Sequence, residues 1–255
     1  MAESPRLSVV VPAYNEMATI EEILSRVQAV DIDKEIVIVD DGSTDGTREF
    51  LSQLSSHTKP AANGATQAGF GRLSRVDNIR VFFQKTNCGK GAALRRGFQE
   101  ARGQVIVIQD ADLELDPQDY HKLIEPIERG LAEVVYGSRF LGRSRQGQPF
   151  SYYVGNKLLT VTSNALTGLK LSDVWTGYKL FRREILQKIQ IRENRFGFEP
   201  EITAKVAQCG CRVFEVPVSY TCRSRKEGKK IGVRDSFRGL WCTLRYSLWP
   251  DRKPH

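Results

Sequence analysis

The sequence predicts an α/β fold with a mostly parallel central sheet flanked by helices. Short apolar runs rich in β-branched residues alternate along the chain with longer stretches in which apolar residues recur at helical spacing. Such alternation is typical of βαβ units, whose helices cover both faces of the sheet. With 255 residues and 40% hydrophobic residues, the chain is long enough for one domain with a large core.

The short apolar runs are predicted to be buried strands, and each is followed by a polar or acidic turn. The predicted strands are Leu7–Val11, Glu35–Val39, Ile79–Phe83, Val105–Gln109 and Ala132–Tyr136. Val213–Tyr220 is also strand-like, but Pro217 interrupts it, which predicts an edge strand or a bulge.

Apolar residues at helical spacing predict the intervening helices. The clearest patterns are Ile20, Ile23, Leu24 and Val27, and then Phe50, Leu51 and Leu54. Further helices are predicted from Asn87 to near Gly103, from about Pro117, and over Tyr153–Leu166. A C-terminal amphipathic helix is predicted within 233–255, with an apolar face of Phe237, Leu240, Trp241, Leu244 and Leu248.

Three further features of the chain bear on its organisation and location. The segment 56–78 is rich in small and polar residues, so a flexible surface insertion is predicted there. No signal peptide is expected, and no run approaches the roughly 18 apolar residues of a membrane span. The five cysteines are irregularly spaced, which predicts free thiols in a reducing cytosol.

The net charge of +8 at pH 7 indicates an anionic partner. A nucleic acid, a nucleotide diphosphate or an anionic membrane surface would each serve. The basic excess is concentrated between Arg223 and Arg245, where lysines and arginines far outnumber the two acids.

Three carboxylates follow the fourth predicted strand at alternate positions, Asp110, Asp112 and Glu114. In an extended chain, alternate side chains project to the same side, so these acids are expected to converge. Ligands of open α/β sheets bind at the carboxyl ends of the strands, and Mg²⁺ prefers carboxylates together with phosphate oxygens. The alternative is a strand that ends in solvated acids on a loop.

Charged loops also follow the neighbouring predicted strands. Asp40 and Asp41 follow the second strand and Arg139 follows the fifth. Carboxylates suit the donors of a base or ribose, and an arginine suits phosphates, so the sheet edge is predicted to bind a nucleotide diphosphate. The motif Gly89-Lys90-Gly91 lacks the upstream glycine and the following Ser or Thr of a P-loop. These residues either begin a helix or have a role near the phosphates.

Short motifs follow one another along the chain: Val10–Glu16, Asp40–Asp45, Gly89–Ala93, Asp110–Asp112, Gly137–Arg139, Thr176–Tyr178, Phe198-Glu199 and Glu227–Ile231. In this order they resemble the family 2 glycosyltransferases of GT-A fold, and within them the dolichyl- or polyprenyl-phosphate mannose and glucose synthases. The resemblance extends from Leu7 to about Tyr246. It implies a Rossmann-like catalytic domain over 1–232, followed by the amphipathic helix.

The resemblance implies roles for individual residues at the donor site. The positions that match nucleoside-binding residues are Pro12, Tyr14, Glu16, Val39 and Asp41. Asp110 and Asp112 match the metal-binding pair, and Ala111 between them packs against the nucleotide. Glu114 stands where several family members have a metal-ligating glutamine, so its role as a third ligand is less secure than theirs.

The resemblance also implies cationic residues around the phosphates. Arg139, Arg223 and Lys229 match these positions, and Lys230 could replace Lys229 because the register of that loop is open. Asp112, Arg139 and Arg223 are the residues predicted to be catalytic.

The implied reaction is an inverting transfer, dependent on Mg²⁺ or Mn²⁺, of a hexose from a nucleotide diphosphate sugar to a dolichyl or polyprenyl phosphate. Mannose is favoured, although the sequence does not separate GDP-mannose from UDP-glucose. A phosphate acceptor is already anionic and needs no strong general base, and the three histidines lie in no motif. Asp112, Asp173 and Glu199 are the acids that could act as a base or be structural.

A lipid acceptor implies a membrane partner. The C-terminal helix fits a bilayer interface, and the alternative is that it packs on the domain core. We therefore expect a peripheral protein at the cytoplasmic face of a membrane, bound directly or through a separate subunit.

Two other functions remain open from the sequence. One is a glycosyltransferase of the same fold with a soluble acceptor, which the basic segment around Arg223 argues against. The other is a non-catalytic or nucleic-acid-binding domain, but no aromatic stacking platform accompanies the basic residues. No nucleic-acid partner is expected.

Overall fold

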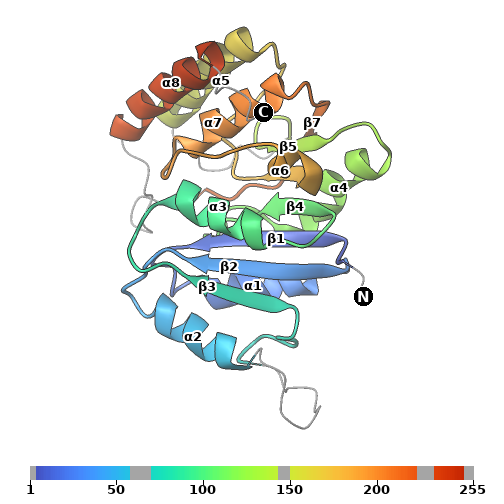
Figure 1. The fold of residues 1–255 in the computed structure, drawn as a ribbon, viewed down its shortest axis with the longest axis vertical. Coiled ribbons are helices and arrows are strands. Elements are labelled where there is room, and N and C mark those ends of the chain that lie inside the picture. The colour runs from blue at the N-terminus through green and yellow to red at the C-terminus, as the bar shows by residue number, and fades with distance from the viewer. Residues whose placement is uncertain (1–3, 58–69, 143–149, 223–232, 250–255) are drawn as a thin grey trace.

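A seven-stranded sheet in the order β3-β2-β1-β4-β6-β5-β7 forms the centre of the protein (Figure 1). The computed structural model describes residues 4–57, 70–142, 150–222 and 233–249. The strands are β1 (Leu7–Ala13), β2 (Lys34–Asp40), β3 (Ile79–Phe83), β4 (Val105–Ile108), β5 (Val134–Ser138), β6 (Lys179–Arg182) and β7 (Val213–Pro217). Among them β6 alone runs antiparallel to its neighbours, β4 and β5. The predicted α/β fold with a mostly parallel sheet is confirmed.

Helices cover both faces of this sheet, which explains why the strands read as continuous apolar runs. In β1, Val9 and Val11 belong to one core cluster, and Val10 between them belongs to the other. The first cluster includes α1 (Ile20–Ala29), α2 (Thr47–His57) and α4 (Tyr120–Glu128), which follows a 3₁₀ turn at Pro117–Asp119. The second includes α3 (Lys90–Glu100), α6 (Arg183–Gln187) and α7 (Phe198–Gln208).

Three elements in the second half of the chain, β6, α6 and α7, were not predicted as a strand or a helix. Strand β6 has four residues, one of them the fully buried Lys179, so it shows no clear apolar pattern. Helix α7 buries the charged residues Glu199, Glu201 and Lys205, which conceals its amphipathic spacing. Strand β7 is the outermost strand on its side of the sheet and ends at Pro217, as the prediction of an edge strand requires.

Residues at both ends of the predicted insertion, 56–78, belong to packed structure. Ser56 and His57 complete α2. Leu73 and Val76 are almost wholly buried in the first core cluster, and Phe70 packs against it. The intervening residues 58–69 lie outside the described part of the chain. All five cysteines are free thiols, as their spacing predicts.

Helices α5 (Phe150–Thr167) and α8 (Val233–Leu248) lie side by side at one end of the molecule, and both contact α7 (Figure 1). Cys242 and Tyr246 of α8 are buried with Ala204 of α7. The C-terminal helix therefore packs on the domain with one face, while Trp241 on the opposite face is 60% exposed. None of the helices in the described ranges has the length and hydropathy needed to cross a bilayer.

Candidate active site

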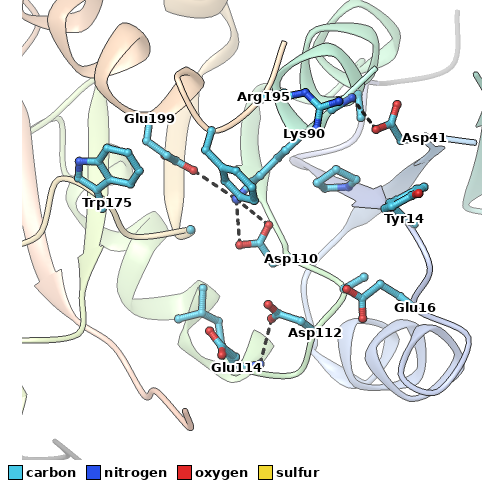
Figure 2. Close-up of a pocket in the computed structure, with 18 of the residues that line it drawn as sticks. Tyr14, Glu16, Asp41, Lys90, Asp110, Asp112, Glu114, Trp175, Arg195 and Glu199 are labelled. Atoms are coloured by element: carbon cyan, nitrogen blue, oxygen red, sulfur yellow. Dashed lines mark hydrogen bonds and ion pairs between the residues drawn. The ribbon is translucent and has the colours of Figure 1, made fainter. Parts of the chain in front are cut away.

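A cavity of about 560 Å³ opens at the carboxyl ends of β1, β2, β4 and β5 (Figure 2). It brings together residues from loops that are far apart in the sequence, as expected for a parallel sheet. The predicted site residues that line it are Pro12, Tyr14, Glu16, Asp41, Asp110, Ala111, Asp112, Glu114 and Arg139.

The acidic loop after β4 delivers all three predicted carboxylates to this cavity, but not along an extended chain. The strand ends at Ile108, and the chain then turns, with Leu113 in the left-handed region at φ 60°. The backbone N–H of Glu114 donates to Asp112 at 3.2 Å, and the Tyr220 hydroxyl donates to Glu114 at 3.2 Å. The expectation of an extended segment with alternate side chains was wrong, and a hydrogen-bonded turn gathers the acids instead.

Gln109 holds this turn in place with hydrogen bonds. Its amide nitrogen donates to the backbone carbonyls of Asp110 at 3.1 Å and Leu115 at 3.4 Å. Its carbonyl oxygen accepts from the buried hydroxyls of Tyr120 and Tyr178, each at 2.7 Å. Because a buried side chain with all its hydrogen bonds satisfied has one favourable orientation, Gln109 fixes where the acidic loop leaves the sheet.

Lys90 places a positive charge among the acids of the cavity. Its ammonium nitrogen lies 2.8 Å from Asp110 and 3.2 Å from Glu199 (Figure 2). Burial opposes the charge, but the two carboxylates outweigh it and raise the pKa of Lys90 above its ordinary value. Glu199 also pairs with the fully buried Lys179, whose pKa burial lowers. Lys90 is the first residue of α3, so the motif is a helix start that also contributes to the site.

Asp41 holds the loop that leads into α3. Its carboxylate accepts from the backbone N–H groups of Cys88 at 2.8 Å and Gly89 at 2.7 Å. Burial raises the pKa of Asp41, while these two donors favour its ionised form. Gly89 has φ +99°, and a Cβ there would lie 2.4 Å from the carbonyl oxygen of Asn194, so glycine is required at this close approach.

Arg139 is fixed by a buried carboxylate behind the cavity wall. Its guanidinium donates to both oxygens of Asp173, at 2.7 and 2.9 Å, and Asn156 of α5 donates to the same carboxylate at 3.1 Å. Burial opposes ionisation of Asp173, but Arg139 outweighs it and holds the pKa of Asp173 below its usual value. Since Asp173 is fully buried and outside the cavity lining, it positions Arg139 and is not placed to act as a base.

Comparison with known proteins places the chain in a family. The model of glycosyl transferase family 2 matches residues 8–190. This chain is a family 2 glycosyltransferase. It is 30% identical to the polyprenol monophosphomannose synthase of Mycolicibacterium smegmatis, over 89% of this chain and 82% of that protein. It is 31% identical to the dolichol-phosphate mannosyltransferase of Pyrococcus furiosus, over 89% of this chain but 60% of that protein.

The glycosyltransferase also has the fold of solved enzymes. It superposes on glucosyl-3-phosphoglycerate synthase from Mycobacterium tuberculosis, crystallised with Mn²⁺, UDP and phosphoglyceric acid, with a TM-score of 0.65. The match covers 97% of this chain and 80% of that one at 21% identity. The predicted family and fold are confirmed, and membership of an enzyme family argues against a non-catalytic or nucleic-acid-binding domain.

Some predicted residues of the glycosyltransferase lie away from the cavity or outside the described structure. The side chain of Val39 is wholly buried in β2 and does not line the cavity, because it points toward Gly97 of α3. It therefore contributes core packing and no side-chain contact to a nucleoside. Arg223, Lys229 and Lys230 lie outside the described residues.

The structure adds cavity residues that the sequence analysis did not select. Trp175, Arg195 and Phe196 line it, and all three come from irregular segments with no periodic signal. Arg195 lies on the same side of the cavity as Asp41, and its charge favours ionisation of that carboxylate (Figure 2). Tyr220 was included only as the end of a strand-like run. Its ring stacks 5.3 Å from the Arg139 guanidinium, and it lines the cavity.

Proposed function

We propose that this enzyme transfers a hexose, with mannose favoured, from a nucleotide diphosphate sugar to a dolichyl or polyprenyl phosphate. The observation on which the proposal rests is that the acidic turn and the fixed Arg139 line the same cavity. Two relatives at about 30% identity are named as a polyprenol monophosphomannose synthase and a dolichol-phosphate mannosyltransferase, which supports mannose as the sugar and a polyprenyl or dolichyl phosphate as the acceptor.

A divalent cation, Mg²⁺ or Mn²⁺, fits the donor set of this cavity. Asp110, Asp112 and Glu114 offer carboxylate oxygens, the ligands that hard cations prefer. In the described residues no three acidic, histidine or cysteine side chains are close enough to enclose a metal by themselves. Mg²⁺ is commonly held by one or two carboxylates together with substrate phosphates. When bound, the cation would supply Lewis-acid stabilisation of the leaving diphosphate.

The residues of the chain then have separate tasks. Asp41, with Pro12, Tyr14 and Glu16, would hold the nucleoside end of the donor. Arg139 would present a preorganised positive charge to a phosphate, because Asp173 fixes the orientation of its guanidinium. We also propose that Arg223 and Lys229 add positive charge around the phosphates.

The proposed reaction is one in-line displacement with inversion. An acceptor phosphate oxygen bonds to the anomeric carbon as the bond from that carbon to the nucleotide diphosphate breaks. The acceptor oxygen is already anionic, so no proton has to be removed from it. Neither His57 nor His121 lines the cavity, which agrees with a reaction that needs no histidine base.

The proposed place of the reaction is the cytoplasmic face of a membrane, where the enzyme binds peripherally or through a separate subunit. An aqueous donor and a lipid acceptor would meet there.

The test is transfer from radiolabelled GDP-mannose and UDP-glucose, in parallel, to a polyprenyl phosphate, with Mg²⁺ or with EDTA. We expect label in the lipid phase from one donor, with Mg²⁺ and not with EDTA. Label transferred only to a water-soluble acceptor would replace the lipid proposal with the soluble-acceptor reaction. Equal transfer with EDTA and with Mg²⁺ would exclude a requirement for a divalent cation.

A further inference from the structure

The two ends of the cavity differ in their chemistry (Figure 2). Tyr14 and Asp41, which are proposed to hold the nucleoside, lie at one end, and Trp175 and Glu199 lie at the other. Asp110 of the acidic turn lies between them. In a nucleotide diphosphate sugar, the hexose is joined to the phosphate that is farther from the nucleoside. A donor with its nucleoside at Asp41 and its diphosphate at the acidic turn therefore places its hexose at the end of Trp175 and Glu199.

The carboxylate of Glu199 is held between two lysines at this end, and its side chain is almost wholly buried. One of its oxygens lies 3.2 Å from the ammonium nitrogen of Lys90, and the other pairs with Lys179. Lys179 is fully buried, and its ammonium group also donates to the backbone carbonyl of Thr176 at 2.5 Å. The same lysine thus fixes the carboxylate of Glu199 and the residue that follows Trp175.

Core packing alone does not account for these buried charges. A buried ion pair seldom adds stability over apolar residues of similar volume, because both charges lose their hydration. The carboxylate of Glu199 is nevertheless placed where it lines the cavity. A carboxylate has about four acceptor positions, so its two oxygens can still accept hydrogen bonds from a ligand. The arrangement therefore favours a binding role for Glu199 over a structural one.

A neutral group that carries hydroxyls fits this end better than a phosphate does. The negative charge of Glu199 would repel a phosphate oxygen, whereas a sugar hydroxyl can donate to Glu199 and accept from the ammonium group of Lys90. Arg139, the cation proposed to face a phosphate, stacks on Tyr220, whose hydroxyl donates to Glu114. An acceptor phosphate is thus expected beside Glu114, which leaves the end at Glu199 for the hexose.

Trp175 adds an aromatic surface at the same end as Glu199. It lines the cavity, and Gly239 of α8 packs against it so closely that a Cβ there would lie 2.2 Å from the indole ring. The apolar C–H groups of a hexose ring can pack on an aromatic ring, while its hydroxyls need hydrogen-bonding partners. An aromatic ring together with a carboxylate and an ammonium group therefore matches both parts of a hexose.

We propose that Trp175, Glu199 and Lys90 form the subsite for the hexose of the donor, and that Glu199 determines sugar specificity by accepting hydrogen bonds from its hydroxyls. The proposal rests on the proposed function for its nucleotide diphosphate sugar, and it does not depend on the lipid acceptor. It assigns binding of the sugar to an acid that the sequence left open as a base or a structural residue.

Two ligands that differ by the hexose test the subsite. Calorimetric titration of the full chain in Mg²⁺, with GDP-mannose and GDP and with UDP-glucose and UDP, measures each affinity. Glu199→Gln should weaken binding of the nucleotide sugar about tenfold or more, as expected for lost hydrogen bonds to a charged group. Binding of the matching nucleotide diphosphate should be unchanged or tighter, because the variant removes a negative charge.

Trp175→Leu tests the same end and keeps the ion pairs of Glu199. It should weaken binding of the nucleotide sugar about fivefold and leave binding of the nucleotide diphosphate unchanged, since leucine lacks the aromatic face. Trp241→Leu is the matched control, because Trp241 is exposed on α8 and does not line the cavity. It should leave both affinities unchanged. Arg195→Gln, on the side of Asp41, should change both affinities by the same factor.

Equal loss of affinity for the nucleotide sugar and the nucleotide diphosphate in Glu199→Gln and Trp175→Leu would overturn the subsite. Unchanged binding of both ligands in these variants would overturn it as well. Thermal unfolding shows whether Glu199→Gln folds, and if it does not, Trp175→Leu decides alone. If the unchanged enzyme binds none of the four ligands, the proposed function fails. If it binds a donor and the variants bind that donor equally well, the hexose subsite alone fails.

Discussion

The ammonium nitrogen of Lys90 lies 2.8 Å from the carboxylate of Asp110, the first of the acids proposed to hold the divalent cation. Lys90 is 16% exposed and also contacts Glu199, so its charge is held close to the acidic turn. Two cations at one carboxylate repel each other, and this repulsion is strong where water is scarce. A divalent cation bound as proposed would therefore compete with Lys90 for Asp110.

Lys90→Met is expected to increase the affinity for Mn²⁺ alone, without nucleotide. Removing one nearby positive charge at a partly buried site is worth on the order of 1–4 kcal/mol, so an increase of about fivefold or more is expected. Electron paramagnetic resonance of free Mn²⁺ measures this directly, independently of turnover. Lys90→Arg, which keeps the charge, should leave the affinity low. Lys122→Met removes a similar ion pair, with Asp119, outside the cavity and should have no effect. Unchanged or weaker Mn²⁺ binding in Lys90→Met would contradict the competition.

Asp112→Asn is expected to abolish metal-dependent transfer while the fold is kept. The amide oxygen can still accept the hydrogen bond from the Glu114 N–H, but it cannot supply the charge. Asp116→Asn is the control, because Asp116 caps the turn before α4 through Gln118 and asparagine caps equally well. An active Asp112→Asn enzyme with normal Mn²⁺ dependence would remove Asp112 from the proposed metal ligands.

The sequence alone predicts the strands and helices of the first half of the fold and most of the acidic residues that line the cavity. The centres of the first two strands, Val9–Val11 and Ile36–Val39, are buried on both faces, so each appears as an uninterrupted apolar run. The polar residues just after them face the cavity because the parallel arrangement brings their carboxyl ends to one edge. Both inferences need only local pattern and topology.

The rest depended on contacts that a local pattern cannot contain. Buried charges such as Lys179 and Glu199 are tolerated because they pair with each other across β6 and α7, and Glu199 pairs with Lys90 as well. The path of the acidic loop depends on a turn that is held by hydrogen bonds from Gln109. Arg195 and Trp175 reach the cavity from irregular segments placed by tertiary packing.

Asp173→Asn is expected to destabilise the protein in a pH-dependent manner. It leaves the guanidinium of Arg139 buried without its charged partner, which costs about 3–5 kcal/mol at neutral pH. The folded pKa of Asp173 lies below its ordinary value of 3.8. The unfolded chain therefore binds the proton first, and the stabilisation is present above about pH 4 and lost as the pH falls through the folded pKa.

Urea unfolding at several pH values measures this effect. The difference between the unchanged protein and Asp173→Asn should be largest near pH 7 and should shrink below about pH 4, where the carboxyl of the unchanged protein becomes neutral. A difference that stays constant with pH would mean that the loss comes from packing and not from the charge.

Gly177→Ala is expected to damage the site more than the fold. A Cβ at Gly177 would lie 2.3 Å from a carboxylate oxygen of Asp110 and 3.2 Å from Leu115. The carboxylate is the far end of a flexible side chain. The side chain of Asp110 can turn away, so stability should fall only modestly. A misplacement of about 1 Å at a reacting centre costs about 100-fold in rate. Transfer should therefore fall strongly, and Mn²⁺ binding should weaken because Asp110 is misplaced.

Gly155→Ala provides the matched comparison. Gly155 lies within α5, and nothing lies within 4 Å of a Cβ added there. Alanine should raise the free energy of unfolding by roughly 0.5–1 kcal/mol through its helix propensity and leave transfer unchanged. If Gly177→Ala instead lost stability without affecting Mn²⁺ binding, the glycine would serve the strand that follows it. If both changes left transfer intact, the position of the Asp110 carboxylate would not limit the reaction.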